Sequence, residues 1–267
     1  MSSIAIAGMG WLGLPLAQRM QALGYNVKGS VSTTTKAADL TARGFNAHAI
    51  MLTEQGVEGD VEQFLADVDT LYILIPPGLR RNSGANHALK MAYFLSAVED
   101  TAVGQVVLVS STSVYSDEQG QVTEKEFPRP DTQAGQQLLE VEQMFFNSPR
   151  LNTAVVRFGG LIGGSRNPVR FLAGREGLSN GQAPVNLIHR EDALQILFTI
   201  LQKKAFGRIF NAVHPDHPVK KDYYRQKAIE LNLEPPSYTE DSEEDRFKQI
   251  DSVNLQLVLN YAFKESI

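Results

Sequence analysis

Short, continuously apolar runs recur along the chain, and stretches with helical periodicity separate them. The runs rich in valine and isoleucine cover residues 4–7, 26–31, 47–51, 70–75, 106–110 and 153–157. Between them, apolar residues at the helical period predict helices over residues 14–23, 35–43, 61–66, 86–98 and 133–146. This alternation of strand and helix predicts an α/β fold with a doubly wound parallel sheet, whose strands are buried on both faces.

The pattern changes after residue 157, where a glycine-rich stretch over residues 159–166 is followed by loops. Further helices are predicted over residues 190–202, 220–231 and 252–259, with a strand over residues 208–212. We therefore expect a doubly wound α/β domain over residues 1–160. A smaller, substrate-side α/β region should cover residues 161–267, from which a strand and helices can return to the main sheet.

The first apolar strand runs directly into a G-x-G-x-x-G turn formed by Gly8, Gly10 and Gly13. In such a turn the first glycine permits the tight bend and the second lets the backbone approach a pyrophosphate. The third glycine lets the helix lie close to the strand, and the start of the helix offers N–H groups to the phosphates. The position of the turn, between a strand and an amphipathic helix, predicts a dinucleotide cofactor. We therefore expect residues 1–160 to form a dinucleotide-binding Rossmann domain.

The end of the second strand indicates which dinucleotide is bound. A carboxylate usually holds the ribose hydroxyls of NAD at this point, but residues 29–36 contain none. Ser32, Thr33 and Lys36 instead offer hydroxyl groups and a cation that suit the 2′-phosphate of NADP. We therefore expect NADP in preference to NAD. The same hydroxyl groups also suit a second role, capping the helix that follows.

Ligands of open parallel sheets lie beyond the carboxyl ends of the strands, which adds further residues to the predicted cofactor site. These are Trp11, Leu12, Pro76, Pro77, Ser110, Phe158 and Gly159.

Composition and charge indicate which kinds of partner suit the chain. The 267 residues carry a formal net charge of −5, which argues against a nucleic-acid partner and favours a small molecule. The chain has no cysteine, and its five histidines show no metal-binding spacing, so we expect no metal. No apolar run reaches the length of a membrane span and no leader pattern is present at the start, so we expect a cytoplasmic protein without a membrane partner.

Four blocks of sequence together resemble the extended or atypical short-chain dehydrogenase/reductases, a group that includes nucleotide-sugar epimerases and dehydratases. The blocks are the glycine turn and the segments VSSTSVY at 109–115, RFGGLIG at 157–163 and VNLIHRED at 185–192. The resemblance covers nearly the whole chain. It implies a nicotinamide cofactor and a small-molecule substrate, such as a nucleotide sugar, in a monomer or homodimer.

The resemblance also implies roles for individual residues. Ser111 matches the serine that binds a substrate oxygen, and Tyr115 is a second candidate for the chemistry. Substrate contacts are expected from Arg166, Asn186 and His189. The family's Y-x-x-x-K pair, however, falls on Ala134 and Leu138 of the predicted helix 133–146, and neither residue can transfer a proton.

Two functions therefore stay open. The first is an NAD(P)-dependent oxidoreductase or isomerase, similar to the epimerases and dehydratases, with a non-standard acid/base system. The second is a non-catalytic NADP(H)-binding sensor or scaffold. The sequence does not decide whether the protein is an enzyme.

Overall fold

The computed structural model describes residues 3–78, 84–240 and 246–267, which form two compact units. Unit 1 comprises residues 1–111, 132–156 and 197–209, and unit 2 comprises residues 112–131, 157–196 and 210–267. Neither unit is one continuous stretch of chain, since 112–131 belong to unit 2 and 197–209 to unit 1. The division of the chain into two domains at residue 160 stays a prediction.

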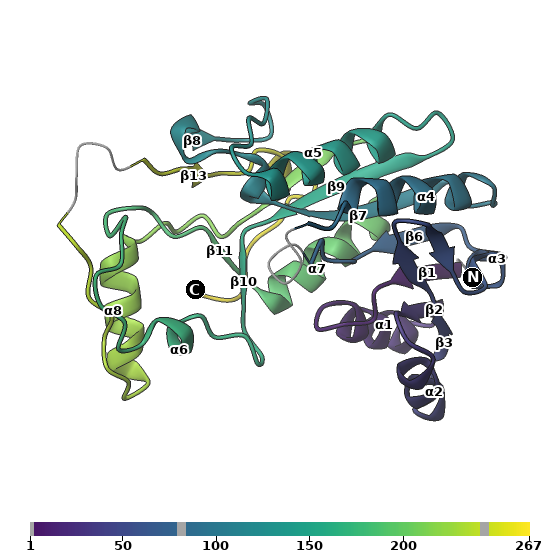
Figure 1. The fold of residues 1–267 in the computed structure, drawn as a ribbon, viewed down its shortest axis with the longest axis horizontal. Coiled ribbons are helices and arrows are strands. Elements are labelled where there is room, and N and C mark those ends of the chain that lie inside the picture. The colour runs from purple at the N-terminus through teal and green to yellow at the C-terminus, as the bar shows by residue number, and fades with distance from the viewer. Residues whose placement is uncertain (1–2, 79–83, 241–245) are drawn as a thin grey trace. The chain divides into compact units, whose positions relative to one another are not determined.

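A seven-stranded parallel sheet carries the fold, which is a Rossmann-type α/β fold as predicted (Figure 1). Its strand order is β12-β9-β7-β6-β1-β2-β3. The strands are β1 (Ser3–Ala7), β2 (Asn26–Val31), β3 (Asn46–Ala49), β6 (Thr70–Ile73), β7 (Gln105–Ser111), β9 (Asn152–Phe158) and β12 (Ile209–Ala212). The order reverses at β1, because the chain continues from β1 to β2 and β3 on one side and resumes with β6 on the other.

Helices cover the sheet of unit 1. They are α1 (Gly13–Ala22), α2 (Thr34–Ala42), α3 (Val61–Leu65), α4 (His87–Glu99) and α5 (Gln133–Phe146). Figure 1 shows α4 and α5 side by side. Ala5, Leu71 and Val106 face α3, α4 and α5 in one core cluster with Phe64, Phe94 and Phe145.

The opposite face of the sheet carries the alternate strand residues. Ile6 lies there against α1, since a Cβ on Gly13 would meet the Ile6 side chain at 3.3 Å. Tyr72 lies on the same face and donates a hydrogen bond to the Leu197 carbonyl in α7 (Arg190–Gln202). Alternation thus buries both faces, which accounts for the continuous apolar runs.

One expected strand is divided. The predicted run 47–51 separates at Ile50 into β3 and a new strand, β4 (Met51–Thr53), which turns back through β5 (Gly56–Glu58) as an antiparallel hairpin. Gly56 and Gly59 have positive φ angles of 145° and 102°, so glycines set both ends of the returning strand. The prediction missed this hairpin because it read the apolar run as one element.

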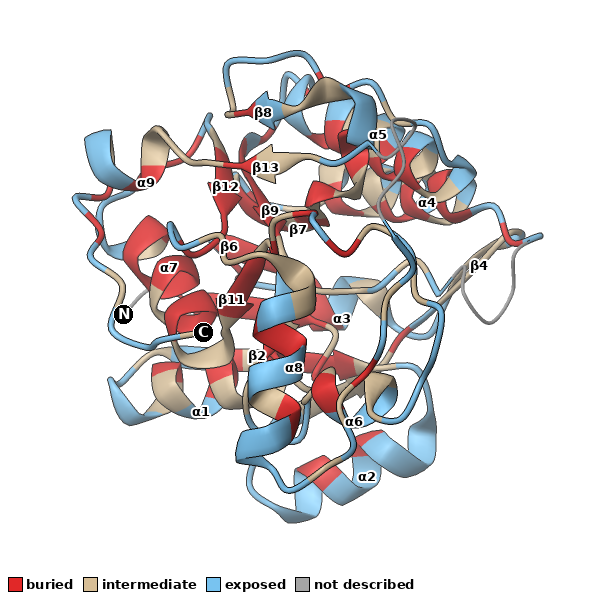
Figure 2. Cartoon of the chain, turned by 90° about the vertical axis from the view of Figure 1, so that its left-hand side faces the viewer, coloured by how far each residue is buried: buried red, intermediate tan, exposed pale blue. Residues whose placement is uncertain are grey.

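Unit 2 contains short elements around its own core. Strands β10 (Gly160–Ile162) and β11 (Leu187–His189) pair in parallel, as do β8 (Gln121–Val122) and β13 (Gln249–Ile250). The helices are α6 (Val169–Leu172), α8 (Lys220–Glu230) and α9 (Asn254–Leu257), and two single turns cover Thr112–Val114 and Asp117–Gln119. Figure 2 shows α8 with both exposed and buried residues. Its buried Tyr223 and Tyr224 join a core cluster with Val185 and Leu187. The predicted final helix, 252–259, is shorter than expected.

No described helix is both long and apolar enough to span a membrane.

Candidate functional site

The glycine turn of unit 1 has the geometry that a pyrophosphate needs. Gly8 has a φ of +107°, and an added Cβ would lie 2.9 Å from the Leu74 carbonyl oxygen, so only glycine fits between β1 and the end of β6. At Gly13 an added Cβ would lie 2.1 Å from the Gly8 carbonyl oxygen. At Gly10, in contrast, no atom of the described residues lies within 4 Å of that position, and the residue is exposed. The turn is therefore tight where the protein contacts itself and open where a ligand would approach.

The start of α1 differs from the other helix starts of unit 1. Helices α2, α3, α4 and α5 each begin with a side-chain cap, from Thr33, Asp60, Asn86 and Thr132 respectively. The residue before α1 is Leu12, which provides no side-chain cap. The first N–H groups of α1 thus receive no side-chain acceptor at the cap position, and a phosphate supplies that acceptor in dinucleotide-binding folds.

A buried hydroxyl group lies at the same end of the sheet. Ser110, at the end of β7, is 7% exposed, and no hydrogen-bond partner is found for its Oγ among the described residues. Ile73, the last residue of β6, lies opposite Leu108 of β7, so Ser110 lies two residues beyond the end of the neighbouring strand. A buried hydroxyl without a partner is uncommon, and it fits a ligand group bound beyond the strand ends. The residues of unit 1 therefore fit a dinucleotide.

The remaining predicted cofactor residues of unit 1 have the following positions. Ser32, Thr33 and Lys36 are exposed after β2, and the Thr33 hydroxyl accepts a hydrogen bond from the Lys36 backbone N–H at 3.3 Å, which confirms its capping role. Trp11 is half-buried and Leu12 is buried. Pro76 is exposed and Pro77 half-buried just beyond β6, before residues 79–83, which lie outside the described part.

Tyr115 lies in unit 2, fully buried in a polar cluster. Its hydroxyl group accepts a hydrogen bond from Arg157 Nη1 at 2.6 Å and lies 3.1 Å from the Thr123 carbonyl and 3.2 Å from Asn211 Oδ1. Burial raises the pKa of Tyr115, while Arg157 and Asn211 act in the opposite direction. The hydroxyl group thus accepts from Arg157 and has two protein acceptors, Thr123 and Asn211, for its one proton, which is typical of a packed structural tyrosine. Ser111, the other catalytic candidate, is half-buried at the end of β7 in unit 1.

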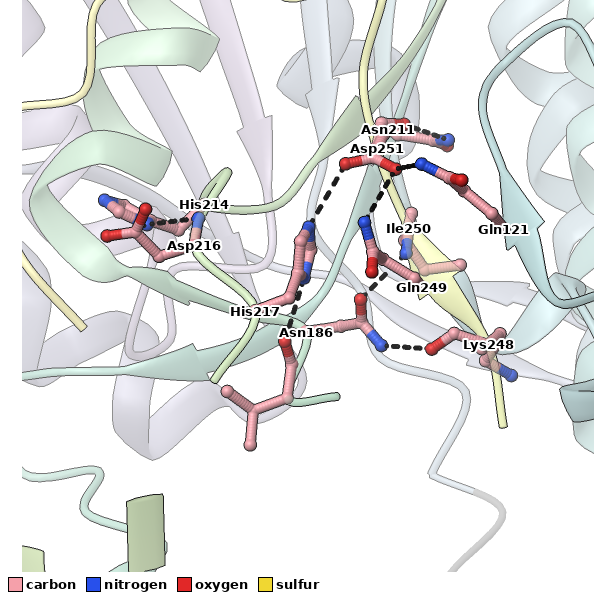
Figure 3. Close-up of polar contacts among 11 residues, drawn as sticks. Gln121, Asn186, Asn211, His214, Asp216, His217, Lys248, Gln249, Ile250 and Asp251 are labelled. Atoms are coloured by element: carbon pink, nitrogen blue, oxygen red, sulfur yellow. Dashed lines mark hydrogen bonds and ion pairs between the residues drawn. The ribbon is translucent and has the colours of Figure 1, made fainter. Parts of the chain in front are cut away.

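The predicted residues Phe158, Gly159 and Asn186 lie in unit 2, where Gly159 and Asn186 are close together. Phe158 is buried, and an added Cβ at Gly159 would lie 2.6 Å from the Asn186 carbonyl oxygen. The side chain of Asn186 donates to the Lys248 carbonyl at 2.9 Å and accepts from the Ile250 N–H at 2.8 Å. Asn186 therefore joins its own segment to β13, as Figure 3 shows.

Two further predicted substrate residues lie in the same unit. Arg166 is exposed, and its backbone closes a turn with Gly163. His189 Nδ1 accepts from the Glu191 N–H at 3.4 Å, and its ring fills the space beside Gly163.

A cavity of about 240 Å³ lies within unit 2, beside Asn186. We call it the basic pocket, because its lining includes Lys220, Arg246 and Lys248 together with one carboxylate, Asp117. The ammonium of Lys248 lies 3.2 Å from Asp117 Oδ1. Burial lowers the pKa of Lys220, and the carboxylate of Asp117 acts in the opposite direction. Three cations against one carboxylate favour an anionic ligand such as a phosphate.

The sequence reasoning missed the basic pocket. Lys220 begins α8, and Lys248 lies just before β13. The signal in the sequence was the pair of basic clusters at 220–221 and 246–248, but nothing in their spacing indicates that they meet. No group of three or more potential metal ligands occurs among the residues described.

These observations define a Rossmann-type α/β protein with a dinucleotide-type glycine turn. No protein-family model matches the chain. It is 32% identical to Protein YeeZ of Escherichia coli (strain K12) over 272 aligned positions, covering 99% of this chain and 96% of that protein. The chain belongs to the same family as Protein YeeZ.

Solved structures with the same fold include sugar-nucleotide enzymes. UDP-glucuronic acid 4-epimerase from Bacillus cereus in complex with NAD is 16% identical, with a TM-score of 0.79 over 99% of this chain and 94% of that one. MoeE5 in complex with UDP-glucuronic acid and NAD is 18% identical, with a TM-score of 0.78 over 99% of this chain and 95% of that one. The likeness covers almost the whole of each chain and concerns the fold.

Proposed function

We propose that this protein binds a nicotinamide dinucleotide at the glycine turn of unit 1. The observation that carries the proposal is the contrast within the turn: Gly8 and Gly13 are closed in by the protein backbone, whereas Gly10 faces open space. Two further observations support it: the start of α1 has no side-chain cap, and the Ser110 hydroxyl group has no hydrogen-bond partner among the residues that the structure describes. Gly8, Gly10, Trp11, Leu12 and Gly13 would hold the pyrophosphate. NAD in two structures of the same fold also supports this choice.

NADP is the proposed form. No carboxylate follows β2 between Val31 and Lys36, and Ser32, Thr33 and Lys36 are exposed there. A 2′-phosphate would gain hydroxyl donors and one cation at this position, and it would meet no repelling charge. Capping by Thr33 is compatible with this role, because the cap uses one lone pair of its hydroxyl group.

The proposed substrate is a small molecule that carries phosphate, of the nucleotide-sugar class. The basic pocket of unit 2 supports it, since Lys220, Arg246 and Lys248 line one cavity and can compensate the charge of a diphosphate. The ligands named for the similar structures, UDP-glucuronic acid among them, belong to this class.

The proposed reaction class is oxidoreduction or isomerisation with a non-standard acid/base system. When bound, a nicotinamide supplies hydride exchange with a carbon that bears an oxygen. The chain's own part is to bind and orient, through the cations of the basic pocket, and to offer the Ser111 hydroxyl group at the end of β7 as a hydrogen-bond donor.

A specific observation favours the alternative, a non-catalytic NADP(H)-binding sensor or scaffold. On α5, Ala134 and Leu138 stand where the resemblance places the tyrosine and lysine, and Leu138 is buried. Neither side chain holds a proton that it can transfer. Binding without turnover would decide for this alternative.

Thermal unfolding with NAD, NADP and their reduced forms tests the proposal. A ligand that binds only the native state raises the midpoint, by about 2.7 kcal/mol of stability at one hundred times its Kd. NADP or NADPH should raise it most, and Lys36→Ala should reduce that shift while leaving the shift with NADH unchanged. The cofactor proposal fails if no dinucleotide changes the midpoint, and the NADP preference fails if NAD raises it more.

A further inference from the structure

The three cations that line the basic pocket differ in their contacts with the protein. The Lys248 ammonium lies 3.2 Å from Asp117 Oδ1 and also donates a hydrogen bond to the Tyr115 carbonyl oxygen. Arg246 is exposed and has an interaction of its own. The Lys220 ammonium, in contrast, makes no hydrogen bond and no ion pair with the residues that the structure describes. Lys220 is therefore the cation of the pocket whose hydrogen-bond donors are left for a ligand.

Backbone hydrogen bonds fix the position from which the Lys220 side chain extends. At the start of α8, the Lys220 N–H donates to the Ala183 carbonyl oxygen at 2.8 Å, and the Lys221 N–H donates to the Gly181 carbonyl oxygen at 2.9 Å. Ala183 itself lines the pocket, so these bonds attach the helix to the pocket wall. Because both N–H groups are occupied, the side chain of Lys220 and not the helix start reaches the ligand.

Two further contacts hold the walls of the pocket together (Figure 3). The Asn186 side chain donates to the Lys248 carbonyl oxygen at 2.9 Å. The His217 ring lies 3.0 Å from the Val185 carbonyl oxygen and 3.2 Å from Asp251 Oδ1. Both contacts join the segment that contains Val185 and Asn186 to the segment around β13. The protein's own contacts therefore hold the pocket in shape, and Lys248 belongs to that wall.

Tyr224 is one helical turn after Lys220 and lines the same pocket. Helical side chains lean toward the start of the helix, and Cβ atoms four residues apart are about 5–6 Å apart, so Tyr224 leans toward Lys220. Its hydroxyl group makes no hydrogen bond with any described residue. Burial raises the pKa of Tyr224, so this hydroxyl group keeps its proton and can donate it to an acceptor. The residue is only 8% exposed, so the pocket is the space in which an acceptor can meet it.

We propose that Lys220 and Tyr224 together bind one phosphate group of the ligand in the basic pocket. This inference rests on the proposed substrate class. A phosphate group has several acceptor oxygens, so it can accept from the ammonium and from the hydroxyl group at once. It also compensates the charge of a partly buried ammonium that has no partner in the described part of the chain. Lys248 and Asp117, in contrast, maintain the shape of the pocket.

Four variants of the full chain test this pair. Lys220→Met removes the charge and Tyr224→Phe removes the hydroxyl group, and neither change breaks a side-chain hydrogen bond with a described residue. Both variants should therefore keep the native midpoint of thermal unfolding. Lys221→Met and Tyr223→Phe are the matched controls, because they make the same chemical changes on the same helix, outside the described lining of the pocket.

Isothermal titration calorimetry at pH 7 with UDP and with inorganic pyrophosphate measures the effect. The native protein should bind both ligands. Lys220→Met should weaken each affinity roughly ten- to hundredfold, as the loss of a charge-assisted hydrogen bond does, and Tyr224→Phe should weaken it about two- to tenfold. Lys220→Arg should retain most of the affinity, because it keeps the charge and the N–H donors. Both control variants should stay within about twofold of the native affinity.

The inference is overturned if the native protein does not bind pyrophosphate. It is also overturned if Lys220→Met or Tyr224→Phe binds pyrophosphate as tightly as the native protein, as binding at the glycine turn of unit 1 would give. An equal loss in Lys221→Met would assign the effect to the general charge of α8, and a lower unfolding midpoint in Lys220→Met would assign it to structure. Either result contradicts the inference.

The two ligands separate this inference from the proposed function. If pyrophosphate binding depends on Lys220 and Tyr224 but UDP does not bind, the phosphate site stands and the proposed substrate class is wrong. If UDP binds equally well to the native protein and to Lys220→Met, the substrate class stands and the inference is wrong.

Discussion

Gly10 and Gly13 are three residues apart in one turn, yet replacing each with alanine should have opposite effects on stability and binding. At Gly13 the new Cβ would lie 2.1 Å from the Gly8 carbonyl oxygen and 3.0 Å from its carbonyl carbon. These are backbone atoms, so no side chain can rotate away. At Gly10 the described part of the chain places no atom within 4 Å of the new Cβ, and the backbone does not have a positive φ.

The magnitudes follow from these contacts. Relieving the overlap at Gly13 requires α1 to move by more than 1 Å from β1, which costs about 2–4 kcal/mol as overpacking of a tight contact. That loss lowers the midpoint of thermal unfolding by about 5–12 °C in a chain of this size. Gly10→Ala has no such cost, and it gains about 0.4–1 kcal/mol from a less flexible unfolded chain. Its methyl group instead occupies the space that a pyrophosphate would use.

Thermal unfolding with and without NADPH separates the two effects. Gly10→Ala should unfold at or above the native midpoint and lose most of the shift caused by NADPH. Gly13→Ala should unfold well below the native midpoint without ligand. If Gly10→Ala keeps the full NADPH shift, the cofactor does not approach the backbone at Gly10. If Gly13→Ala is as stable as the native protein, the close contact between α1 and β1 is not a constraint.

Three further predictions concern buried polar groups. Asp192 accepts hydrogen bonds from the Tyr261 hydroxyl group at 2.6 Å and from the backbone N–H groups of Lys264 and Glu265. Asp192→Ala should therefore lower the free energy of unfolding by about 2–4 kcal/mol and speed proteolysis after residue 260. Tyr261→Phe removes one of these hydrogen bonds and should lower the free energy of unfolding by less. Burial lowers the pKa of His87 to about 4, below its value in the unfolded chain. The stability from the neutral ring is therefore complete above pH 6.5, and about 3 kcal/mol of it is lost as the pH falls toward 4. The midpoint of urea unfolding should fall over this pH range, and His87→Gln should make it less dependent on pH. Tyr115→Phe removes a hydrogen-bond acceptor of the buried Arg157 and should lower the free energy of unfolding in urea by about 1–3 kcal/mol. Weaker binding of NADPH or UDP with unchanged stability would contradict a structural role of Tyr115.

Much of the fold could be predicted from local signals. Residues 26–31 and 133–146 are a strand and a helix with the predicted bounds, because each pattern is long and its ends are marked, the latter by the Thr132 cap. The hairpin β4–β5 was missed, since an apolar run gives no sign of a break at Ile50. The last helix was overestimated, because its periodicity continues into residues that do not pack as a helix.

The parallel α/β architecture and the glycine turn could be predicted without the structure, because both depend on residues close together in the chain. Gly8, Gly10 and Gly13 need only their order and the flanking strand and helix to specify a turn. Only the tertiary structure brought Lys220 near Lys248, and His217 between Val185 and Asp251. Lys220 and Lys248 are 28 positions apart, and His217 is 32 positions from Val185 and 34 from Asp251. The number of ways to pair polar residues at such separations is too large for spacing alone to select one.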